Sequence, residues 1–176
     1  MDPVLHAVTV AALVALLLHA ALGKLRAPLH FAGVLADYRL LPAAWVTPAS
    51  WLLPIGELAV AAGLALPATR SAAALACAAL LLAYAAAIGI NLARGRRTID
   101  CGCGGPDARR PIQPAMLARN AALAALAASL LAPLAPRELV WLDWLHATML
   151  LAAAVGLYAT LGQWTQNRRV LRAVER

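Results

Sequence analysis

Long apolar stretches separated by short polar segments dominate the sequence. Five stretches approach the roughly 20 residues that a helix needs to cross a bilayer. They cover residues 4–23, 48–67, 71–93, 115–132 and 139–162. Alanine and leucine dominate, and no stretch alternates polar and apolar residues, so helices rather than barrel strands are expected to satisfy the backbone in lipid. We predict an all-α membrane protein, with a helical domain over residues 1–162 and a polar tail over 163–176.

The connection after the first stretch carries its own helical pattern. Phe31, Leu35 and Tyr38 recur at helical spacing, after Pro28 and before Pro42. Proline suits the first turn of a helix and also ends one. We expect a short amphipathic helix at the membrane interface.

Composition supports the membrane interpretation. Of the 176 residues, 63% are hydrophobic and 13% are charged, whereas a soluble domain carries about 25% charged residues. The first stretch lacks the basic start and the short apolar run of a signal peptide. We therefore expect it to be a retained helix.

The net charge of +7 is unevenly distributed. With five spans, twelve of the 15 Lys and Arg residues lie on one side: three in 24–47, five in 94–114 and four in the tail. The positive-inside rule places that side in the cytoplasm. The prediction is a multi-pass bacterial inner-membrane protein with its N-terminus outside. No basic patch interleaves with stacking aromatics, so nucleic acid is not expected as a partner.

Several polar side chains lie inside or at the ends of the apolar stretches, where insertion costs roughly 2.5–3.5 kcal/mol for a charged residue. They are His19, Lys24, Glu57, Asn91, Arg119 and Asn120. Their depths predict a polar pocket, for a ligand or a proton, beneath one membrane face. The alternative is structural: an ion pair of Glu57 with Lys24 or Arg119, and hydrogen bonds between helices. Cys77 is expected to be a packing residue deep in the third stretch.

The most distinctive motif is Cys101-Gly102-Cys103, in the long basic loop between the third and fourth stretches. A disulfide across one residue closes a small, strained ring, and strained exposed disulfides are labile. Nearby arginines favour the thiolate. Redox exchange through Cys101 and Cys103 is therefore predicted. Metal or metalloid capture and a non-catalytic pair remain alternatives, although two thiolates are too few for a closed zinc site.

The order and spacing of these motifs are similar to those of the MauE family, among the wider DoxX-like membrane proteins. The resemblance spans about residues 5–132. It rests on Gly23-Lys24-Leu25, Pro28, Phe31, Tyr38, Leu40-Leu41-Pro42, Glu57, Cys101-Gly102-Cys103-Gly104 and Arg119-Asn120. It implies a four-helix core plus a C-terminal helix. It also implies a role in redox maturation, in which MauE proteins assist the disulfide-rich small subunit of methylamine dehydrogenase together with a thioredoxin-like partner.

Together these features predict a membrane thiol-disulfide oxidoreductase, with a quinone as a candidate electron partner. The alternatives are a binder or transporter of a thiophilic metal ion or small molecule, and a non-catalytic scaffold. The sequence does not decide on which side of the membrane the cysteine loop lies. The charge rule places the loop in the cytoplasm, whereas maturation of a secreted client requires it outside.

Overall fold

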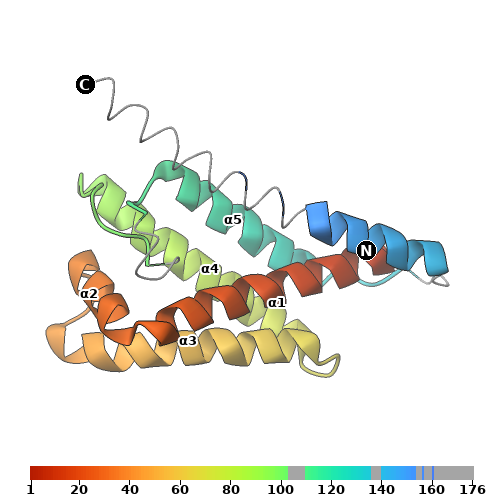
Figure 1. The fold of residues 1–176 in the computed structure, drawn as a ribbon, viewed down its shortest axis with the longest axis horizontal. Coiled ribbons are helices and arrows are strands. Elements are labelled where there is room, and N and C mark those ends of the chain that lie inside the picture. Colours follow the sequence, from red (N-terminus) through yellow and green to blue (C-terminus); the bar gives the residue numbers. More distant parts are fainter. Residues whose placement is uncertain (103–109, 136–139, 154–155, 157–159, 161–176) are drawn as a thin grey trace, which may run out of the picture. The chain divides into compact units, whose positions relative to one another are not determined.

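The computed structural model of the protein describes residues 1–102, 110–135, 140–153, 156 and 160. Its elements are helical, which confirms the predicted fold class (Figure 1). They are α1 (Pro3–Arg26), α2 (Pro28–Tyr38), α3 (Ala43–Ala65), α4 (Arg70–Ala93) and α5 (Pro114–Ser129), followed by helical residues 141–153. Within the described residues, α1, α3 and α4 are long and apolar enough to cross a membrane. The chain is accordingly a membrane protein.

The chain forms two compact units, one of residues 13–133 and one of residues 1–12 with 134–176. In the second of these, the Asp2 carboxylate accepts a hydrogen bond from Val4 N at 2.8 Å and so caps the start of α1. Asp143 accepts from Val140 N at 2.9 Å, at the start of the helical residues 141–153. The predicted fifth span lies partly outside the described residues, and the predicted tail lies wholly outside them.

Helix α2 is the short helix that the sequence predicts. Pro28 occupies its first turn, where the missing N–H has no intrahelical partner in any case. Arg39 ends the helix in the left-handed conformation (φ 49°, ψ 41°), and its N–H bonds back to Ala36 O. The buried side chains of α2 are Phe31, Val34 and Tyr38.

Helix α3 begins earlier than the apolar pattern predicts. The predicted stretch starts at Pro48, whereas the helix starts at Ala43, and both Pro48 and Pro54 lie inside it. Ser50 Oγ donates to Thr47 O at 2.7 Å within this segment. Prolines are tolerated inside membrane helices because side chains and neighbouring helices satisfy the backbone groups that they leave unpaired.

A tight turn joins α3 to α4 as an antiparallel hairpin. Thr69 Oγ1 donates to Gly63 O at 2.9 Å, and Arg70 Nε donates to Leu64 O at 2.9 Å. These bonds satisfy carbonyls at the end of α3 that lack helical partners. The helices approach so closely here that a Cβ on Gly63 would lie 2.9 Å from Ala73 Cβ.

Replacing Gly63 with alanine is therefore expected to destabilise the hairpin by about 1–3 kcal/mol, the usual cost of overpacking. The matched control is Gly56→Ala, because Gly56 is also in α3 but has nothing within 4 Å of an added Cβ. The control should be neutral or stabilising by up to about 1 kcal/mol through helix propensity. Thermal unfolding in detergent measures both, and equal midpoints would contradict the close approach.

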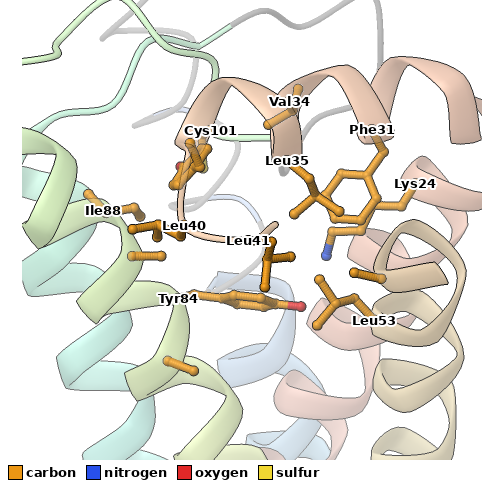
Figure 2. Close-up of a pocket in the computed structure, with 14 residues that line it drawn as sticks. Lys24, Phe31, Val34, Leu35, Leu40, Leu41, Leu53, Tyr84, Ile88 and Cys101 are labelled. Atoms are coloured by element: carbon orange, nitrogen blue, oxygen red, sulfur yellow. The ribbon is translucent and has the colours of Figure 1, made fainter. Parts of the chain in front are cut away.

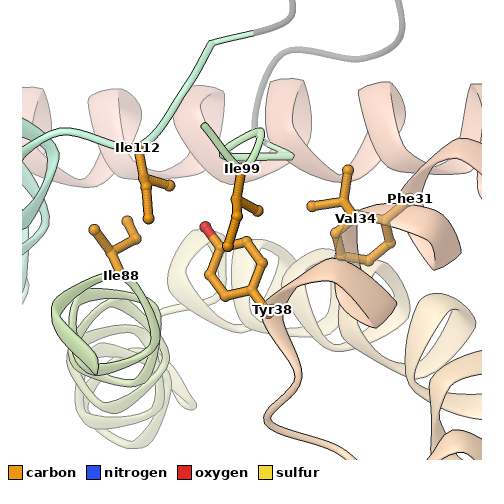
Figure 3. Packing of buried hydrophobic residues seen from close by; sticks show 6 residues of the cluster. All are labelled: Phe31, Val34, Tyr38, Ile88, Ile99 and Ile112. Atoms are coloured by element: carbon orange, nitrogen blue, oxygen red, sulfur yellow. The ribbon is translucent and has the colours of Figure 1, made fainter. Parts of the chain in front are cut away.

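A hydrophobic cluster joins α2 to the base of the cysteine loop (Figure 3). Phe31, Val34 and Tyr38 meet Ile88 of α4 and the two isoleucines that flank the loop, Ile99 and Ile112. Cys101 packs against this cluster and is partly buried. The core of residues 13–133 thus extends to the predicted redox motif.

Candidate functional site

The two ends of the cysteine loop are joined by backbone hydrogen bonds. Cys101 N donates to Arg110 O at 2.8 Å, and Ile112 N donates to Ile99 O at 2.9 Å. Asp100 and Pro111 form an isolated antiparallel bridge. These contacts fix the backbone position of Cys101. Cys103 lies outside the described residues.

Asp100 organises the loop base through its side chain. Its Oδ1 accepts hydrogen bonds from Arg110 N at 3.0 Å and from Gly102 N at 3.3 Å. Its Oδ2 lies 3.4 Å from His30 Nε2 on α2. One carboxylate therefore connects both strands of the loop base to α2.

Gly102 lies directly against α2. Its φ is +73°, a conformation that residues with a Cβ rarely adopt. A Cβ at this position would lie 3.0 Å from Val34 Cγ1 and 3.4 Å from the Phe31 ring. The glycine of the Cys-Gly-Cys motif thus permits a close approach to α2.

A buried ion pair lies inside the helical unit. Lys24 Nζ of α1 donates to Glu57 Oε1 of α3, with side chains 4% and 1% exposed. Tyr84 of α4 donates its hydroxyl to the same oxygen at 2.8 Å. The ammonium also lies 5.0 Å from the centroid of the Tyr84 ring and 5.4 Å from that of Phe31. Side chains from α1, α2, α3 and α4 therefore meet at this one ion pair.

A pocket of about 340 Å³ lies between the ion pair and the loop (Figure 2). Its wall comes from α2, α3, α4 and the α2–α3 connection, and it is almost wholly apolar. Lys24 and Cys101 both line it and lie on opposite sides in Figure 2. Glu57, the partner of Lys24, is fully buried and is not among the lining residues. The pocket is thus more apolar than the sequence predicts, because the carboxylate is paired and covered.

Comparison with known proteins gives a consistent match. A sequence profile described as "Methylamine utilisation protein MauE" matches residues 1–133, which is most of the chain. The chain belongs to the MauE family.

Curated relatives carry the same description. The MauE-family chain is 40% identical over 123 residues to "Methylamine utilization protein MauE" of Methylorubrum extorquens, covering 70% of this chain and 66% of that protein. It is 46% identical to the Paracoccus versutus protein of that name, covering 69% and 66%, and 40% identical to that of Methylophilus methylotrophus, covering 78% and 72%. The match thus spans about two thirds of the length of the first two relatives. No solved structure matches the chain.

The other predicted site residues of this MauE-family chain occupy different places. Asn91 Oδ1 accepts from Arg96 at 3.1 Å, and the same guanidinium donates to Tyr38 O at 3.4 Å, so Asn91 helps to join α2 to the start of the loop. Asn120 is buried in α5, and Arg119 is partly buried beside it. His19 is exposed on α1, and none of these four lines the pocket. Cys77 is fully buried, as expected of a packing residue.

The structure adds residues that the sequence does not single out. Tyr84 sits in an apolar run and resembles a packing aromatic, while His30 and Asp100 are 70 positions apart. Only the structure shows that Tyr84 donates to the Glu57 carboxylate and that His30 lies against Asp100. The one available sequence signal is that Asp100 directly precedes Cys101, the first cysteine of the Cys-Gly-Cys motif.

Proposed function

We propose that this MauE-family protein exchanges disulfides through Cys101 and Cys103 and acts in methylamine utilisation. The descriptions of the relatives as methylamine utilization proteins support the pathway. The thiol chemistry is supported chiefly by the position of Cys101. This residue is partly buried and lines the pocket, and its backbone N–H is held by a hydrogen bond to Arg110 O.

The mechanism that follows is thiol-disulfide exchange through a mixed disulfide between one loop sulfur and one partner sulfur. A partner thiolate attacks the loop disulfide, and the second partner thiol then releases the reduced loop and the oxidised partner. The reverse reaction, in which a loop thiolate attacks an oxidised partner, forms the same mixed disulfide. Arginines near the loop stabilise the thiolate, since a positive environment lowers the free energy of the anion. Lys24 and Glu57 shape the pocket beneath. The proposed partner is a thioredoxin-like protein, and the proposed client is a disulfide-rich protein such as the small subunit of methylamine dehydrogenase.

The proposed location is the inner membrane, with the basic loop on the cytoplasmic side. Labelling of the loop thiols in intact cells by an impermeant maleimide, with and without prior reduction, tests this orientation. Labelling without permeabilisation would place the loop outside and would favour direct contact with a secreted client.

Trapping tests the exchange itself. Cys103→Ser should accumulate a mixed disulfide with a thioredoxin-like protein, because the resolving thiol is gone while Cys101 can still attack. The adduct should appear on a non-reducing gel and disappear with reductant. Cys77→Ser is the matched control and should trap nothing, because it keeps both loop thiols and removes only a fully buried thiol of α4.

The proposal fails if Cys103→Ser traps no partner and the Cys101→Ser/Cys103→Ser double variant still supports maturation of the client. Stoichiometric metal binding that alkylation abolishes would instead indicate capture of a thiophilic ion.

A further inference from the structure

The pocket between Lys24 and Cys101 has the features of a binding site for a lipid-soluble molecule. Its volume of about 340 Å³ lies in the range of small-molecule sites, about 300–1,000 Å³. Aliphatic and aromatic side chains form nearly all of its surface. At its edge, Leu40 and Leu41 are 36% and 41% exposed, which provides an apolar route from the surface.

One polar group is directed into this apolar space. An ammonium carries three N–H donors, and within the described residues Lys24 donates one of them to Glu57 Oε1. The ammonium also lies over the Phe31 and Tyr84 rings, Lys24 lines the pocket, and Figure 2 shows its nitrogen among the lining side chains. Because the Lys24 side chain is only 4% exposed, an acceptor oxygen on a ligand would be strongly favoured there.

We propose that the pocket binds the ring of a prenylated quinone, with one carbonyl oxygen on Lys24 and the tail leaving past Leu40 and Leu41. A quinone combines an apolar ring, a carbonyl acceptor and a lipid-soluble tail, which together match this lining. A plain acyl chain fits the apolar wall but offers no acceptor to the ammonium. This inference rests on the proposed function, because the quinone would accept the electrons of the thiols that take part in the exchange.

The chemistry balances as a two-electron step. The S–H bonds of Cys101 and Cys103 break, and an S–S bond forms between the two sulfurs. Two electrons and two protons pass to the quinone, whose two carbonyl groups become the hydroxyl groups of the quinol. The ammonium of Lys24 stabilises the negative charge that develops on the nearer oxygen. Electrons would then flow from partner thiols through the loop to the quinone pool.

Photolabelling tests the site directly. Purified full-length protein in lipid nanodiscs is labelled with an azido-benzoquinone, in competition with decylubiquinone. The label should map to pocket peptides from α2 to α4, and decylubiquinone should displace it. Ala87→Phe should reduce labelling at least tenfold, because Ala87 lines the pocket. The matched control is Ala86→Phe, which changes the adjacent exposed residue and should label like the wild type.

A second measurement separates this inference from the proposed function. The Cys101→Ser/Cys103→Ser variant should bind the quinone like the wild type, whereas only the reduced wild type should convert decylubiquinone to quinol, one per dithiol. In Ala87→Phe, trapping of a mixed disulfide through an added Cys103→Ser should persist, because the exchange with a partner needs no ligand bound in the pocket. If trapping is lost while quinone binding is intact, the proposed disulfide exchange is overturned and the quinone site is not.

The quinone assignment is overturned if decylubiquinone does not displace the label, or if Ala87→Phe and Ala86→Phe label equally. Equal displacement by decanol, which has the alkyl chain without the ring, would show an acyl-chain site and would also overturn it.

Discussion

Replacing Lys24 with methionine is expected to destabilise the protein by about 3–5 kcal/mol, because it leaves the buried Glu57 carboxylate without its cation. Glu57 is fully buried, and its Oε2 has no hydrogen-bond partner among the described residues. The remaining donor to Oε1 is the Tyr84 hydroxyl, which is neutral. Glu57→Leu should cost a similar amount, since it leaves the ammonium unpaired.

The double variant Lys24→Met/Glu57→Leu should recover most of the lost stability. Apolar residues of similar volume often replace a buried ion pair at little cost, because the desolvation penalty disappears with the charges. The unfolding free energy of all four proteins, measured by denaturation in mixed micelles, gives the coupling between the two residues. Additive single effects would contradict the pairing.

The same double variant separates the structural and functional interpretations of this pair. If the pair only fixes the packing of α1 on α3, the stable double variant should retain thiol exchange and quinone binding. If Lys24 holds a ligand, the double variant should fold but lose at least tenfold in quinone labelling. The second outcome is expected here, because Lys24 lines the pocket.

Replacing Asp100 with alanine is expected to release the cysteine loop and to raise the alkylation rate of Cys101 by about 10- to 100-fold. The alanine leaves Arg110 N and Gly102 N without their acceptor and removes the contact with His30. An unsatisfied buried donor costs about 1–3 kcal/mol, and about 1.4 kcal/mol corresponds to a tenfold change in the open population. Alkylation of a partly buried thiol follows that population.

The experiment uses a Cys103→Ser background, so that the accessible loop thiol is Cys101 while Cys77 stays buried. Asp100→Asn is the matched control. It keeps an acceptor oxygen for both backbone N–H groups and loses only the charge opposite His30, so its rate should rise much less. Equal rates in the alanine and asparagine variants would show that the backbone contacts do not hold the loop.

The positions of the helices were predictable because each helix is determined by the apolar residues of its own segment. A long run of apolar residues must be helical in lipid whatever it packs against, so α1, α3 and α4 follow from composition. The ends were less predictable. α3 begins at Ala43 rather than Pro48, because a proline inside a helix has the same sequence signature as a proline that starts one.

The candidate site was partly predictable for a similar reason. Lys24 and Glu57 stand out because charges are rare in apolar runs, and the sequence indicates that they need partners. Which partner Glu57 takes depends on the rotation of each helix about its axis. In an alanine- and leucine-rich helix, all faces are apolar, so the sequence leaves that rotation undetermined. His19 is accordingly exposed, while Tyr84 faces the carboxylate.

The sequence by itself determined an all-helical membrane chain, its Cys-Gly-Cys loop and the charges that required explanation. These are properties of single residues and short windows, where hydration and hydrogen bonding act locally. Only the tertiary structure decided that Lys24 pairs with Glu57, that Asp100 joins the loop to His30, and that Lys24 and Cys101 line one apolar pocket. Those contacts join residues 33 to 77 positions apart, and packing of whole helices, not local preference, brings them together.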